Sequence, residues 1–69
     1  MIEVRIPVAD VDRHENEVLR GQVVLTRLRD AGIPAYGILW LRGVAHGVLR
    51  MWKDDLFDDI VYQWEDATL

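Results

Sequence analysis

The sequence predicts a small α+β domain with the element order β-α-β-β-β, in which one helix packs on a mostly antiparallel sheet. Three observations predict it: apolar and polar residues alternate over residues 2–8, a helical period follows over residues 13–30, and alternation returns after residue 36. The chain has 69 residues, which is enough for one domain spanning residues 1–69.

The first strand is expected over residues 2–8. Glu3 and Arg5 fall on one face, and the opposite face carries Ile2, Val4, Ile6 and Val8. This alternation is typical of a strand with one buried and one solvated face. Pro7 has no backbone N–H to donate, so it indicates the end of the strand or an exposed edge.

A helix is expected over residues 13–30. Asp12 is a suitable N-cap, and Glu15 stands three positions later, as a capping box requires. Gly32 suits the left-handed position that follows a helix, and Pro34 prevents continuation. Arg13 and Glu17 would form an i,i+4 pair.

The apolar stripe of this helix is expected to pack on the sheet. It comprises Val18, Gly21, Val24, Leu25, Leu28 and Ala31. A glycine in mid-helix is costly, so Gly21 suggests a close approach to a strand backbone. Leu19 and Val23 lie off the stripe and would remain exposed in a monomer.

Three further strands are expected, arranged as a meander. The run Gly37–Leu41 is apolar on both faces, which is typical of a central strand covered on both sides. Residues 43–47 would form a turn. Residues 48–53 and 60–65 alternate again and complete the sheet.

The connection over residues 54–59 is expected to be a loop or one helical turn. Asp55 would cap it, and Leu56 and Phe57 would anchor it to the rest of the domain. Trp40, Trp52 and Trp64 recur every 12 residues, which matches the spacing of a strand plus its turn.

Composition excludes several classes of site. There is no cysteine, which removes disulfides, thiolate zinc sites and a cysteine nucleophile. A chain of this length buries only a marginal core, and oligomerisation often stabilises such a fold. No apolar run reaches the roughly 20 residues that span a bilayer, and the first residues lack a signal-peptide core. We therefore expect a cytoplasmic protein without membrane partners.

No catalytic constellation is apparent, so we expect neither an enzyme nor a cofactor. His14 begins a zincin-like segment, but Val18 stands where the second histidine is required. His46 lies in a predicted turn without an identifiable nucleophile, and a turn residue is the simpler interpretation. A basic patch interleaved with tryptophan would suit single-stranded nucleic acid, but structural pairing is favoured for its arginines, which are Arg27, Arg29, Arg42 and Arg50.

The densest polar feature is the aspartate group Asp54, Asp55, Asp58 and Asp59. Residues 54–69 hold six acidic side chains and no basic one, which disfavours direct nucleic-acid binding. The aspartates could be a solubilising turn, a calcium or magnesium site, a DNA-mimicking patch, or a surface that faces a protein partner. They are our leading partner-binding candidates.

Excess apolar residues predict a second buried surface, most economically a second copy of the chain. The self-association candidates are Leu19, Val23, Leu39, Leu41 and Trp52. We expect a homodimeric interaction module, with an acidic DNA-mimic inhibitor as an alternative. A further alternative is a small hydrolase or metal-dependent enzyme that uses His46 and the aspartates.

The segment from Leu25 to Ala35, with its Gly-Ile-Pro-Ala exit, resembles small domains called putative signal-transducing proteins. That resemblance implies a fold element and no function. The small size and arginine bias also look like accessory proteins of actinobacterial phages. This second resemblance implies a host protein as a possible partner.

Overall fold

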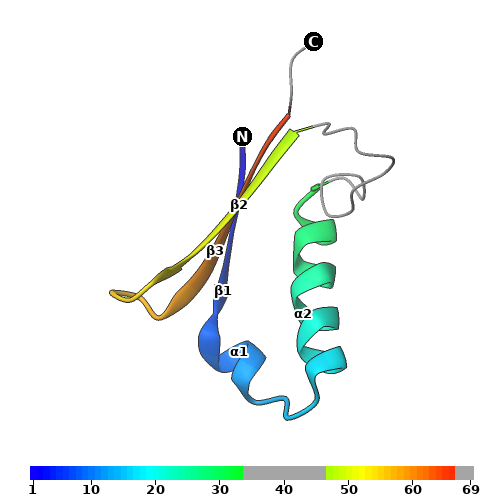
Figure 1. Cartoon of the computed structure of the whole chain (residues 1–69), viewed down its shortest axis with the longest axis vertical. Helices are drawn as coiled ribbons and strands as arrows, with labels where there is room; N and C mark the ends of the chain where they lie inside the picture. Colours follow the sequence, from blue (N-terminus) through cyan, green and yellow to red (C-terminus); the bar gives the residue numbers. More distant parts are fainter. Residues whose placement is uncertain (34–46, 67–69) are drawn as a thin grey trace.

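A computed structural model describes residues 1–33 and 47–66 of the chain (Figure 1). The described elements follow the order β1 (Ile2–Pro7), α1 (Val8–Asp12), α2 (Glu17–Asp30), β2 (Gly47–Asp54) and β3 (Asp59–Asp66). The α+β class is confirmed. The predicted strand Gly37–Leu41 and most of the predicted turn 43–47 lie outside the described residues.

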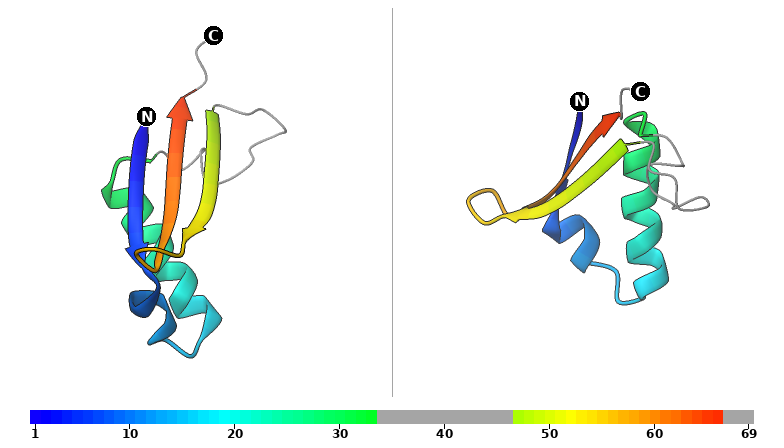
Figure 2. Two further views of the ribbon diagram at one scale, coloured as in Figure 1. Left: turned by 90° about the vertical axis from the view of Figure 1, so that its left-hand side faces the viewer. Right: turned by 45° about the horizontal axis from the view of Figure 1, so that its top comes forward.

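The described strands form an antiparallel sheet with the order β1-β3-β2. β3 is central: Val4 of β1 pairs with Tyr62, and Met51 of β2 pairs with the same residue from the other side. Figure 2 shows the three strands side by side, with α2 behind one face of the sheet. The predicted pairing of residues 48–53 with 60–65 as neighbouring strands is therefore confirmed.

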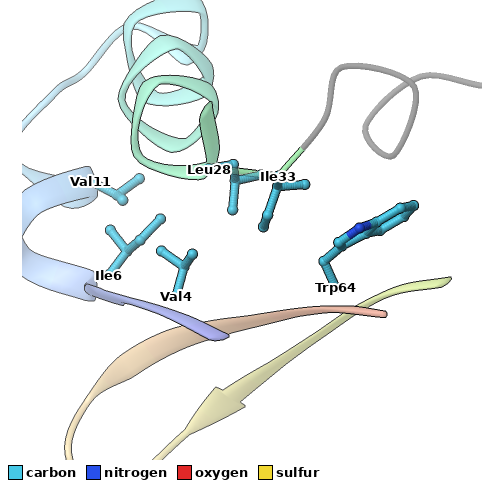
Figure 3. Packing of buried hydrophobic residues seen from close by; sticks show 6 residues of the cluster. All are labelled: Val4, Ile6, Val11, Leu28, Ile33 and Trp64. Carbon is cyan, nitrogen blue, oxygen red and sulfur yellow. The ribbon is translucent and has the colours of Figure 1, made fainter. Parts of the chain in front are cut away.

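The core lies between the sheet and the helices (Figure 3). Its buried members are Val4, Ile6, Val11, Leu28, Ile33 and Trp64. They come from β1, α1, the C-terminal end of α2 and β3, so segments far apart in the sequence meet in one cluster. The alternation in the first strand predicted its inward face correctly, because Val4 and Ile6 are buried while Glu3 and Arg5 are exposed.

The helical region begins differently from the prediction. A short helix, α1, follows β1 directly and buries Val11, and α2 starts only at Glu17. The N-cap of α2 is Asn16, whose Oδ1 accepts a hydrogen bond from the Val18 N–H at 2.8 Å. Asp12 ends α1 instead of capping the long helix. Arg13 and Glu17 consequently do not share one helix.

The end of α2 agrees with the prediction. Gly32 has φ +92°, and its N–H donates to the Arg29 carbonyl at 3.0 Å. The Ile33 N–H donates to the Leu28 carbonyl at 3.1 Å, and both side chains are buried. This is a Schellman motif with its apolar contact, and it delivers Ile33 into the core.

The buried face of α2 is turned relative to the predicted stripe. Leu28 is buried, but Val18 is 67% exposed and Leu25 is 40% exposed. Val23, which we expected off the stripe, packs against the core. Gly21 would have nothing within 4 Å of an added Cβ, so it makes no close approach to a strand. Periodicity predicted the spacing of apolar positions, whereas tertiary packing selects which edge of a broad stripe turns inward.

Candidate functional site

The aspartate group surrounds the turn that joins β2 to β3. Asp54 is the last residue of β2 and pairs with Asp59, the first residue of β3. Asp55 and Asp58 lie in the turn itself. The structure therefore brings all four predicted partner-binding residues together, at the end of a hairpin that projects away from α2 (Figures 1 and 2).

Arg5 binds this turn from the neighbouring strand. Its Nη1 lies 2.9 Å from Oδ2 of Asp54 and 3.6 Å from Oδ2 of Asp59. The guanidinium also lies 5.9 Å from the centroid of the Phe57 ring, which is within the range of a cation–π contact. One side chain of β1 thus contacts both ends of the hairpin turn and its aromatic residue.

The turn backbone is held by two further sets of hydrogen bonds. Oδ1 of Asp54 accepts from the N–H of Leu56 at 3.0 Å and from that of Phe57 at 3.4 Å. The carbonyl of Asp58 accepts from the Val8 N–H at 2.9 Å, and Asp58 itself has φ +53°. The capping residue is therefore Asp54, where we had expected Asp55.

Leu56 and Phe57 are exposed at the tip of this turn. Leu56 is 84% exposed and Phe57 is 67% exposed, so our expectation that they anchor the loop to the domain is wrong. The anchoring function falls to the Asp54 carboxylate and Arg5. As a consequence the turn presents two large apolar side chains to solvent.

The Asp54 carboxylate retains its charge at neutral pH. The hydrogen bond from Arg5 lowers the pKa of Asp54 below its ordinary value of 3.8. Lys53 lies 3.7 Å from a carboxylate oxygen of Asp55 and 3.7 Å from one of Asp58. Because the side chains of these two aspartates are 89% and 69% exposed, the long contacts neutralise them only weakly.

The outward face of the sheet is mostly polar in the described residues. It carries Glu3, Arg5, Arg50, Gln63 and Glu65 around Val61, which is 0% exposed. Gln63 donates to Glu3 at 2.9 Å, and this hydrogen bond lowers the pKa of Glu3. Val48 and Trp52 are the exposed apolar residues of this face. The run that we expected to be apolar on both faces, Gly37–Leu41, lies outside the described residues.

The self-association candidates fall on two sides of the molecule. Leu19, which is 46% exposed, and Val23 line a shallow hollow of about 360 Å³ between α1 and α2. Trp52 is 39% exposed and faces away from the helices. Leu39 and Leu41 lie outside the described residues. The described candidates therefore do not form one continuous patch.

The hollow, which we call the helix hollow, has basic groups beside its apolar residues. Among the side chains that line it are Asp10, Arg13, His14, Leu19, Val23 and Arg27. Arg27 also donates to the Arg5 carbonyl at 3.3 Å, and Arg20 donates to the His14 carbonyl. These hydrogen bonds link α2 to β1 and to the segment between α1 and α2.

The remaining acidic residues of the C-terminal part lie at the other end of β3. Glu65 and Asp66 are separated from Asp59 by most of the strand, about 20 Å at ~3.3 Å per residue. Asp66 accepts a hydrogen bond from the indole Nε1 of Trp64 at 2.7 Å. The six acidic side chains therefore form no single contiguous surface, which disfavours the DNA-mimic alternative.

In residues 1–33 and 47–66 no three His, Cys, Asp or Glu side chains are placed to hold a metal ion. Neither α1 nor α2 is long and apolar enough to cross a membrane. His46, Trp40 and Arg42 lie outside the described residues.

Comparison of the chain with protein-family models, with curated proteins and with solved structures finds no match. The resemblances to putative signal-transducing domains and to phage accessory proteins thus stay predictions.

Proposed function

We propose that the protein is a small non-enzymatic protein-interaction module that binds through β2 and the turn after it. One observation carries this proposal. Within residues 1–33 and 47–66, nine large apolar residues are exposed, and five of them belong to this segment. Val48 and Trp52 lie on the outward face of β2, Met51 lies on its helix-side face, and Leu56 and Phe57 lie in the turn. A local concentration of exposed apolar side chains marks an interaction site more often than scattered ones do.

The composition of the segment also suits protein binding. Aromatic and methionine side chains are enriched at the centres of protein interfaces, and the aspartates stand around the tip as a polar rim does. The surplus of acidic charge would repel anionic lipid and nucleic acid. A protein partner is therefore favoured over a membrane or a nucleic acid, and in an infected cell it would be a host protein.

Affinity purification of the tagged chain from its native cells, followed by reconstitution with purified components, tests this proposal. We expect a protein that forms a stoichiometric complex with the wild-type chain, either another protein or the chain itself. If no protein reconstitutes such a complex at micromolar concentration, the proposal is wrong.

A further inference from the structure

The tip of the hairpin has exposed apolar side chains beside acidic ones, and the helix hollow has apolar side chains beside basic ones. The turn tip, which we define as Leu56 and Phe57, is a protruding apolar pair flanked by aspartates. The helix hollow has apolar residues, Leu19 and Val23, with Arg13 and Arg27 among its other lining side chains. We infer that the turn tip of one copy inserts into the helix hollow of a second copy. This inference rests on the proposed function and names the partner as the chain itself.

The turn tip is already ordered by contacts within its own chain. Asp54 accepts hydrogen bonds from two backbone N–H groups of the turn, and Arg5 in turn binds Asp54. The Asp58 carbonyl accepts a hydrogen bond from the Val8 N–H. Binding would therefore have to immobilise little more than two side chains. A preorganised loop loses less conformational entropy on binding than a free one does.

The turn tip and the helix hollow carry opposite charge. Four aspartates stand around the turn tip, and Arg5 and Lys53 are the two basic residues that pair with them, which leaves a net charge of −2. Two arginines and one aspartate line the helix hollow, which leaves +1 when His14 is neutral. The surplus of negative charge on one surface meets a surplus of positive charge on the other, and such complementarity favours this docking register.

The helix hollow has room for an aromatic side chain. The helix hollow has a volume of about 360 Å³, and both of its apolar lining residues are incompletely buried. An aromatic ring buries about 150–250 Å² of surface, so Phe57 would be the main anchor of the contact. If each copy offers its turn tip to the other, the contact closes into a symmetric dimer.

Light scattering coupled to size-exclusion chromatography tests this contact on the full chain. We expect the wild-type chain to exceed its monomer mass of 8.0 kDa at high micromolar concentration. The double substitution Leu56→Ser/Phe57→Ser should weaken self-association by about 30-fold, the loss typical of interface hot spots. Leu19→Asp, which changes the helix hollow, should weaken self-association by a similar factor. Val18→Asp is the matched control, because Val18 is 67% exposed, as Phe57 is, but does not line the helix hollow.

Mixing the two defective variants separates this contact from any other. Each variant alone lacks one half of the contact, but an equal mixture contains one intact turn tip and one intact helix hollow. We expect the mixture to associate at a concentration where each variant alone is monomeric. Circular dichroism of each variant verifies that it is folded.

Three results would overturn the inference: a wild-type chain that stays at 8.0 kDa, a mixture that fails to associate, or a Val18→Asp variant as defective as the others. A monomeric chain that still forms a reconstituted complex with another protein would refute this inference and leave the proposed function standing. A chain that binds neither itself nor another protein would refute both.

Discussion

Nη1 of Arg5 lies 2.9 Å from Oδ2 of Asp54, although the two residues are 49 positions apart in the sequence. This contact joins β1 to the turn between β2 and β3. Asp54 in turn binds the backbone of the turn, so the position of Leu56 and Phe57 depends on a side chain from β1.

Replacement of Arg5 by methionine should raise the pKa of Asp54 toward its ordinary value of 3.8. The hydrogen bond from Arg5 is the largest cause of the lowered pKa, and methionine cannot donate it. A carboxyl group whose pKa is lower in the folded protein than in the unfolded chain stabilises the fold at pH values above its unfolded-state pKa. This stabilisation is lost as the pH falls through the folded-state pKa. Wild type should therefore be more stable than the variant at pH 7. The part of the difference that is due to Asp54 should begin to fall near pH 4 and vanish only below the folded-state pKa of Asp54, which lies under 3.8.

Carbon-detected NMR titration of the Asp54 carboxyl, together with melting curves across the same pH range, measures both effects. Arg50→Met, on the outward face of β2, is the control. An unchanged Asp54 pKa in the Arg5→Met variant would show that Arg5 does not control this carboxylate.

Gly47→Ala should destabilise the domain by about 1–3 kcal/mol, the usual range for overpacking. A Cβ at this position would lie 2.3 Å from Cη2 of the buried Trp64 and 2.5 Å from the carbonyl oxygen of Glu65. Gly21→Ala is the matched control and should stabilise by about 1 kcal/mol, because the site is open and lies within a helix. Urea unfolding measures both, and equal effects of the two substitutions would contradict the packing described for Trp64.

Asn16→Ala should destabilise the domain by about 1 kcal/mol, because it removes the side-chain cap of α2. Asp12→Ala should have a smaller effect, because Asp12 ends α1 and does not cap α2. Thermal unfolding of the two variants distinguishes the observed start of the helix from the one that the sequence predicted. A larger loss from Asp12→Ala would favour the single long helix.

Local patterns predicted most of the described fold. Alternation predicted the faces of the first strand and the positions of the last two strands, and Gly32 predicted the end of α2. These features depend on residues within one element or one turn, which the sequence presents together. The split into α1 and α2 was missed, because Val11 joins the core only through tertiary contacts.

The candidate site was predicted only in part. The four aspartates were identified because they cluster in the sequence, but the exposure of Leu56 and Phe57 was not. An apolar pair in a short loop usually packs inward, and here the loop is held instead by Arg5. A partner 49 residues distant leaves no local signal in the sequence. The charge alternation of β1 was the sole indication that a basic side chain would stand on this face.

The most direct test of the interaction surface is photo-crosslinking in native cells. Benzoylphenylalanine would replace Phe57 in one variant and Val18 in a second, separate variant, since both residues are 67% exposed. We expect a protein adduct at position 57, formed with a second copy or with another protein, and little or none at position 18. Equal adducts at the two positions, or none at position 57, would contradict the assignment of the hairpin turn as the binding surface.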